Sequence, residues 1–142
     1  MNKTIGLIFL ASVCLPACGD DDGGDQAEDG VEIEGTWVSN FESTEVIEGD
    51  SWSVDSSFGT SVSEIVEFSN DDNSAVLGAE DGTFGRVVWT EITDGSFYYC
   101  NVSYLEASVE DAIANSQPTD TSDPLNSGCG AGDFGWTMLT RQ

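Results

Sequence analysis

Histidine is absent from this 142-residue chain, and its absence removes a large part of enzyme chemistry. A Ser-His triad is excluded, because it needs histidine as the base that activates the nucleophile. The lysine needed for a Ser-Lys dyad occurs only as Lys3, in a segment that we predict below to be removed. A pair of carboxylates could carry out glycoside hydrolysis. Among 27 acidic residues, however, some pair will have a suitable spacing by chance, so the sequence gives no evidence for such a site. We therefore expect no catalytic residue, no cofactor and no enzyme activity.

Basic residues are nearly as scarce, since Lys3, Arg86 and Arg141 stand against 27 aspartates and glutamates. Nucleic acid is excluded as a partner, because binding it requires basic groups that neutralise phosphates. Two interpretations of the acidic composition remain. It provides a surface for cations or cationic partners, or it is an adaptation to a salty medium that screens repulsion within about 10 Å. We favour the second.

Apolar runs are too short to span a bilayer as a helix, which needs about 20 residues. The most apolar stretch, Ile5 to Val13, has nine residues and follows the basic Lys3. This length and this flank are typical of a secretory signal core.

The stretch is followed by Leu15-Pro16-Ala17-Cys18, which resembles the lipobox of bacterial lipoproteins. The resemblance implies a signal peptide over residues 1–17 and a mature chain that starts at Cys18, lipidated on its sulfur and acylated (palmitate) on its amine. Several acyl chains anchor a protein stably to a membrane. Gly19, rather than an acidic residue, follows Cys18. In enterobacterial lipoproteins an acidic residue directly after the cysteine favours retention in the inner membrane, so the resemblance implies the outer membrane, on its periplasmic or surface face.

Four cysteines are present. Cys14 leaves with the signal peptide and Cys18 carries the lipid, so Cys100 and Cys129 remain. Disulfides persist in exported proteins, and we predict that this pair is bridged. Two cysteines without histidine do not make a structural zinc centre, so no metal site is predicted.

The mature chain is long enough for one domain with one core. Residues 19–34 are rich in Asp, Gly and Glu, which indicates a flexible tether. We divide the chain into a signal peptide (1–17), a lipidated cysteine with an acidic tether (18–34) and a single β domain (35–142). The folded part begins at about Val31 or Gly35.

Runs of β-branched and aromatic residues alternate with turn signals, which predicts an all-β domain. Both an antiparallel up-and-down barrel and a sandwich of about eight strands remain open, with one short helix before the last strand. The expected strands are 36–41, 45–48, 52–55, 62–68, 74–78, 84–92, 96–104 and 134–140.

Two further expectations concern the end of this series. In 96–104, we expect the face with Tyr98, Cys100, Val102 and Tyr104 to be the core side, because it carries the disulfide. Residues 104–116 have helical composition. The apolar stripe of this helix would consist of Leu105, Val109, Ala112 and Ile113.

Three segments are rich in side-chain oxygen: Ser69 to Ala75, Ala79 to Gly82, and Thr93 to Gly95. They lack the ligand spacing of an EF-hand calcium loop. Each lies between two expected strands, where Asn, Asp and Gly favour turns. We predict turns.

The opening Gly35-Thr36-Trp37 resembles the Gly-x-Trp signature of lipocalins and other calycins. In that family an arginine near the end of the last strand packs over the tryptophan, and Arg141 stands at the matching place. Thr93-Asp94-Gly95 falls where the family often has Thr-Asp-Tyr, with glycine replacing the tyrosine. The segment 105–133 departs from the lipocalin layout and is either a lid or a sign of another antiparallel fold.

Two functions from different classes follow. The first is a lipid-anchored binding or interaction module of the cell envelope, with a protein or glycan partner. The second is a lipocalin-like carrier that holds a small apolar ligand in the barrel. The residues that would line such an interior are Trp37, Trp89, Phe97, Tyr99 and Trp136.

The acidic composition predicts a salt effect on stability. Without its signal peptide the chain has two arginines against 27 acidic residues, a formal charge of −25. Because added salt screens this repulsion, we expect the melting temperature of the protein to rise from low to molar NaCl. A melting temperature independent of NaCl would contradict the interpretation as a salt adaptation.

Overall fold

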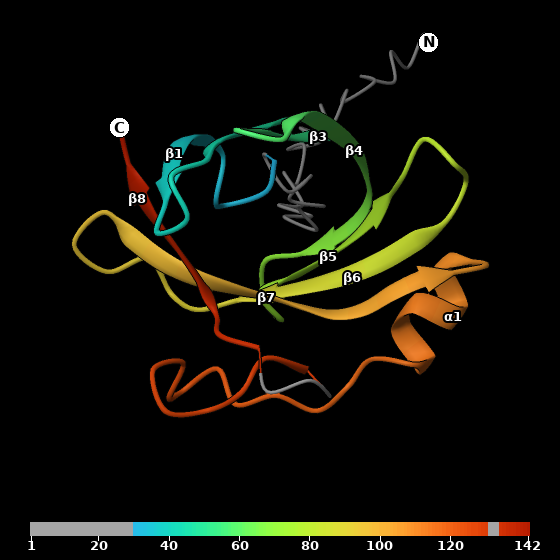
Figure 1. Ribbon diagram of the computed structural model, residues 1–142. Coiled ribbons are helices and arrows are strands. Elements are labelled where there is room, and N and C mark those ends of the chain that lie inside the picture. Colours follow the sequence, from blue (N-terminus) through green and yellow to red (C-terminus); the bar gives the residue numbers. More distant parts are fainter. Residues whose placement is uncertain (1–29, 131–133) are drawn as a thin grey trace, which may run out of the picture.

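Eight antiparallel strands close into a barrel in the computed structural model of the chain, which describes residues 30–130 and 134–142 (Figure 1). Each strand pairs with the next, and β8 pairs with β1. The prediction of an all-β domain is confirmed, and the barrel rather than the sandwich is formed. The strands are β1 (Gly35–Ser39), β2 (Thr44–Glu48), β3 (Ser51–Ser56), β4 (Gly59–Ser69), β5 (Ser74–Gly78), β6 (Phe84–Trp89), β7 (Ser96–Glu106) and β8 (Thr137–Arg141).

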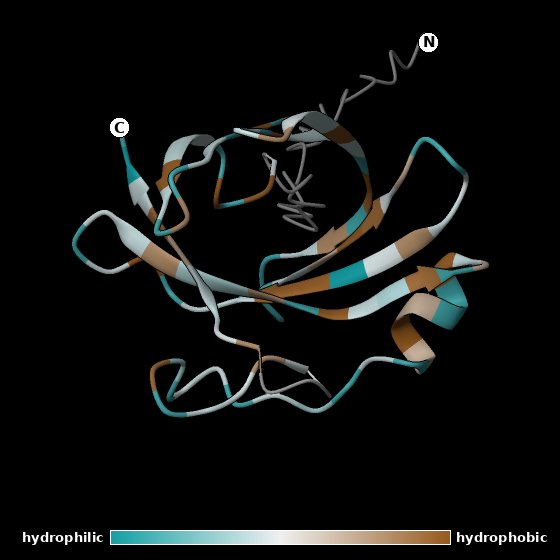
Figure 2. Cartoon of the chain, viewed as in Figure 1, coloured by the Kyte–Doolittle hydropathy of each residue, from teal (hydrophilic) through white to brown (hydrophobic). Residues whose placement is uncertain are grey.

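The barrel interior is built from the alternation of side chains along these strands, visible as alternating brown and pale residues in Figure 2. β-branched and aromatic residues suit the pleated, half-buried surface of each strand. The buried interior cluster consists of Val31, Ile33, Trp37, Ile47, Trp52, Ile65, Ala75, Val87, Trp89, Phe97 and Leu139.

The packed chain begins before β1. Val31 and Ile33 are buried in the interior cluster, with 2% and 0% of their surface exposed. These two residues lie in the segment that we assigned to the tether, and they extend the folded part back to the earlier of the two expected starts. The predicted signal peptide, Cys18 and the rest of the predicted tether lie outside the described residues.

A second apolar cluster lies on the outside of the barrel. It contains Cys100, Val102, Cys129 and Trp136, with Tyr98 packed against it. The prediction that the Cys100 face of β7 is the barrel side is therefore wrong, because the alternate residues of β7 point inward. Both faces of this strand are covered, since the segment after β7 supplies a second layer over its outer face (Figure 1).

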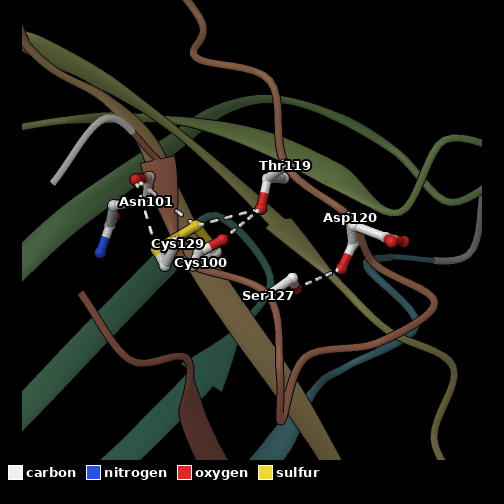
Figure 3. The surroundings of a disulfide bond; sticks show 7 residues. Cys100, Asn101, Thr119, Asp120, Ser127 and Cys129 are labelled. Carbon is white, nitrogen blue, oxygen red and sulfur yellow. Dashed lines mark hydrogen bonds between the residues drawn. A yellow bond between two sulfur atoms is a disulfide. The ribbon is translucent and has the colours of Figure 1, made fainter. Parts of the chain in front are cut away.

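The disulfide Cys100–Cys129 is present, as predicted, and holds this segment against β7 (Figure 3). Hydrogen bonds reinforce the attachment. The backbone N–H of Gln117 donates to the Val102 carbonyl of β7 at 2.7 Å. Within the segment itself, the Thr119 hydroxyl donates to the Gly128 carbonyl at 3.2 Å. The described part of the excursion is thus a cover on the barrel wall.

The helix α1 (Val109–Ala114) is shorter than the predicted helix 104–116. Strand β7 continues to Glu106, which pairs with Phe84 of β6. Residues 104–106 are therefore part of the sheet and not of the helix. Leu105 has φ of +55° and is 78% exposed at the strand end, so it is not on the helix stripe as predicted. Ser108 starts the helix by accepting a hydrogen bond from the Asp111 N–H.

Replacing Cys100 and Cys129 by serine should lower the free energy of unfolding by about 3 kcal/mol, because the bridge closes a loop with a sequence separation of 29 residues. The barrel should persist, since the bridge lies outside it. Urea unfolding measures the first effect and far-UV circular dichroism the second. Reduced wild-type protein is the control and should match the variant; loss of the strand signal in both would show that the barrel itself needs the bridge.

Candidate functional site at the barrel mouth

One end of the barrel is closed by residues 30–34. The indole N–H of Trp37 donates to the Ile33 carbonyl at 2.9 Å, and that of Trp89 donates to the Glu32 carboxylate at 2.6 Å. Asn70, in the turn between β4 and β5, binds the backbone of the same segment from the side. We call this the closed end.

Arg141 completes the closed end. Its guanidinium lies 5.1 Å above the Trp37 ring and donates to the Glu34 carbonyl at 3.0 Å. Gly35 leaves room for it, because a Cβ there would lie 3.1 Å from Nη2 of Arg141 at a φ of +143°. The packing of Arg141 over Trp37 expected from the calycin resemblance is confirmed, and the closed eight-stranded barrel is consistent with a calycin-like fold.

The interior between the two ends is filled by aromatic rings. Trp37 and Phe97 are fully buried and meet edge to face at 4.8 Å, and Trp52 meets Tyr99 at 5.0 Å. Trp89 is fully buried as well. Of the residues expected to line a ligand, Trp37, Trp89, Phe97 and Tyr99 are brought together here, whereas Trp136 lies in the outer cluster. Their contact with a ligand stays a prediction.

A buried carboxylate lies beside these rings. Glu45 is 1% exposed and accepts hydrogen bonds from Trp52 Nε1 at 2.8 Å, from the Tyr99 hydroxyl at 3.2 Å and from the Ser43 hydroxyl at 3.4 Å. Strand β2 points it inward because Glu45 alternates with Val46 along the pleat. All three partners are uncharged, and their hydrogen bonds replace water that the carboxylate loses on burial.

Burial raises the pKa of the Glu45 carboxyl, and the hydrogen bonds from Trp52, Tyr99 and Ser43 oppose this rise. Burial also raises the pKa of the Tyr99 hydroxyl, with the charge of Glu45 as the second cause. Tyr99 therefore stays protonated and remains a donor to Glu45. The carboxyl group can bind and release a proton, and its hydrogen-bond partners are two hydroxyls and one indole N–H.

The opposite end of the barrel, where the hairpins β1–β2, β3–β4 and β5–β6 turn, is hollowed; we call it the mouth. A cavity of about 180 Å³ lies there, lined by residues of β4, β5, β6 and β7 that include Ser63, Leu77, Phe84 and Leu105. It shares Ser63 and Ala79 with a groove of about 390 Å³ beside β4. It shares Tyr104 with a hollow of about 360 Å³ between the end of β7 and the covering segment, which Cys129 and Phe134 also line.

Large apolar side chains are exposed to solvent at the hairpin turns of the mouth, near the end of β7 and, in the case of Phe134, in the covering segment beside β7. Isolated exposed apolar residues need no explanation, but a gathering at one end of a domain favours an interaction site. These residues are Phe41 (68% exposed), Phe58 (100%), Tyr104 (59%), Leu105 (78%) and Phe134 (69%).

The oxygen-rich segments form turns, as predicted. The Asn73 N–H donates to the Asn70 carbonyl, the Gly82 N–H to the Ala79 carbonyl, and Thr93 pairs with Ser96. Within residues 30–130 and 134–142, no group of three or more potential metal-ligating side chains comes together. In the same residues, no helix has the length and apolar character needed to cross a membrane.

Sequence reasoning missed both Glu45 and the mouth. In Thr44-Glu45-Val46-Ile47-Glu48, either set of alternate residues contains an apolar and an acidic side chain, so the inward face was ambiguous. The hollows at the mouth lie where one strand extends beyond the last paired residue of its neighbour, and the sequence of a single strand does not show where that pairing ends. Only the exposed Phe58, which lies between two expected strands, was a readable signal, since Phe41 was placed at the end of the expected strand 36–41.

No family model, curated protein or solved structure matches this chain.

The raised pKa of Glu45 predicts a pH-dependent contribution to stability. The folded protein holds this proton more tightly than the unfolded chain, so the contribution is full below the ordinary glutamate pKa of about 4.3. It falls as the pH rises through the raised folded value. Glu45→Gln keeps one oxygen acceptor and does not titrate. The stability of wild type minus that of the variant, measured by urea unfolding, should therefore decrease as the pH rises above about 4.

The matched control is Glu48→Gln, which removes an exposed carboxylate from the same strand. A difference between wild type and Glu45→Gln that stays constant, or grows with pH, would show that folding does not raise the pKa of Glu45.

Proposed function

We propose that this chain is a lipid-anchored protein of the cell envelope that acts as a non-enzymatic binding module, with the barrel mouth as its binding surface. The observation that carries the proposal is the contrast between the two parts of the barrel. The interior is filled by Trp37, Trp89 and Phe97, whereas the mouth is hollowed and exposes five large apolar side chains. A partner therefore finds contact area at the mouth rather than inside.

Two observations support an exported, anchored protein. The lipobox-like Leu15-Pro16-Ala17-Cys18 would place acyl chains on Cys18, and the disulfide Cys100–Cys129 suits an oxidising compartment. The described chain starts at the closed end of the barrel, so a tether from Cys18 would reach the domain on the side opposite the mouth. Anchoring in the outer membrane would thus leave the mouth free for an envelope protein or a glycan.

The alternative is a carrier of a small apolar ligand. It is supported by the calycin-like barrel and by the cavity of about 180 Å³ with Leu77, Phe84 and Leu105 in its lining. A larger ligand would have to displace buried rings, at a cost of several kcal/mol for each aromatic side chain moved from the core. This cost makes the carrier the second candidate.

The test places a photo-cross-linking amino acid at Leu105 in the full chain, expressed in cells that make it natively. Leu105 lies at the mouth, and Ile92, 40% exposed in the β6–β7 turn at the closed end, is the matched control position. We expect cross-linked adducts from Leu105 and few from Ile92. Equal yields at both positions, or none at Leu105, would contradict a binding surface at the mouth. Native mass spectrometry of the same protein in detergent tests the alternative, because a bound small molecule would favour the carrier.

A further inference from the structure

Strand β4 is longer than its two neighbours and pairs with them in turn. Its first part, from Gly59 to Glu64, pairs with β3, and its second part, from Glu64 to Ser69, pairs with β5. Beyond the pair Glu64–Gly78 the chain of β5 turns away toward β6. In the part of the chain that the structure describes, residues 59–63 thus have a strand on one side only.

The backbone groups on the open side belong to Thr60 and Val62. The N–H of Ile65 donates to the Asp50 carbonyl on the β3 side at 2.7 Å. Successive residues of a strand direct their N–H and C=O to opposite sides, so Val62 and Thr60 face away from β3. Two N–H and two C=O groups therefore point, at the spacing of a β-ladder, toward the place where a further strand would lie.

The other long strand, β7, also extends past its neighbour, but its extension is covered. Its pairing with β8 ends at Tyr99–Thr137, and beyond it the Gln117 N–H binds the Val102 carbonyl and the disulfide holds the covering segment. Along β4 the corresponding place is a groove of about 390 Å³. Its lining consists of Thr60, Ser61, Val62, Ser63, Ala79, Glu80 and Asp81.

The negative charge of this groove favours a positively charged occupant. Glu80 and Asp81 stand opposite the β4 edge, and the lining contains no basic side chain. Asp81 accepts hydrogen bonds from the backbone N–H (3.0 Å) and the hydroxyl (2.7 Å) of Thr83, which lower the pKa of its carboxyl and keep it ionised. A second copy of this chain would bring its own excess of acidic residues to the same place, so repulsion disfavours edge-to-edge pairing between copies.

We propose that the edge of Thr60 and Val62 accepts an extended segment of a partner protein as an added β-strand, and that this segment carries lysine or arginine beside apolar residues. The inference rests on the proposed function and names the partner's chemistry. Main-chain hydrogen bonds to β4 would supply affinity, and Glu80, Asp81 and the half-exposed Val62 would select alternate side chains of the segment.

The probe is a fluorescent octapeptide of alternating lysine and valine, titrated into the full chain in detergent micelles and followed by anisotropy. The same octapeptide with every backbone amide N-methylated is the control, because it keeps the four positive charges and the valine side chains but has no backbone N–H to donate to β4. We expect saturable binding of the first peptide and at least tenfold weaker binding of the second. Amide hydrogen exchange at Thr60 and Val62 should slow when the first peptide binds. Equal binding of both peptides would overturn the proposal.

Two variants locate the contact. Val62→Pro removes one N–H donor from the open side, a place where an edge strand tolerates proline, and should weaken binding about tenfold. Glu80→Gln should weaken it about two- to threefold, whereas Glu48→Gln at the closed end should not. If Val62→Pro does not fold, Glu80→Gln and the amide exchange decide the outcome. Unchanged affinity in Glu80→Gln together with unchanged exchange at Thr60 would refute the site.

Two remaining outcomes separate this inference from the function on which it rests. Adducts from Leu105 that persist unchanged in Val62→Pro would keep the mouth as a binding surface and reject strand addition at β4. A dimer of the full chain in sedimentation that Val62→Pro abolishes would make a second copy the occupant and overturn the cationic segment.

Discussion

Closure of the barrel depends on the packing around Trp37. β1 pairs with β2 on one side and with β8 on the other, so the ring of Trp37 lies where the last strand completes the sheet. Arg141 covers the ring, Phe97 meets its edge, and its indole N–H holds the carbonyl of Ile33. The segment before β1, the last strand and β7 are thus joined through one fully buried side chain, and contacts far apart in sequence become mutually supportive.

The mouth follows from the same closure combined with unequal strand lengths. β4 and β7 each have 11 residues, while their neighbours have five or six. Irregular register between Ile65 and Glu67, and again between Phe84 and Val87, bends the long strands so that they serve two neighbours. Near the closed end every strand finds partners, and toward the mouth the long strands extend beyond them. The extension of β7 is covered by the disulfide-linked segment, whereas a groove lies beside the extension of β4.

Local sequence predicted the strands well because alternation and turn residues are local properties. Gly35-Thr36-Trp37, the turn at Thr93 to Gly95 and the pairing of Cys100 with Cys129 could all be read from the chain. The inward face of β7 could not, since a covering layer makes both of its faces apolar. The position of Trp136 and the burial of Glu45 failed for a related reason. Each depends on which distant segment packs against the residue, and the periodicity of a single strand does not contain that information.

The acidic composition takes on a structural meaning once the open edge of β4 is considered. An unpaired strand edge is a template for association with other copies of the same chain, and proteins commonly guard such edges with charge. Glu80 and Asp81 beside the edge carry the same sign as the chain as a whole, so close approach of a second copy is opposed both locally and by net charge. A cationic strand meets neither obstacle. The same carboxylates that keep copies apart would therefore favour a partner of opposite charge, which joins solubility and selectivity in one feature of the surface.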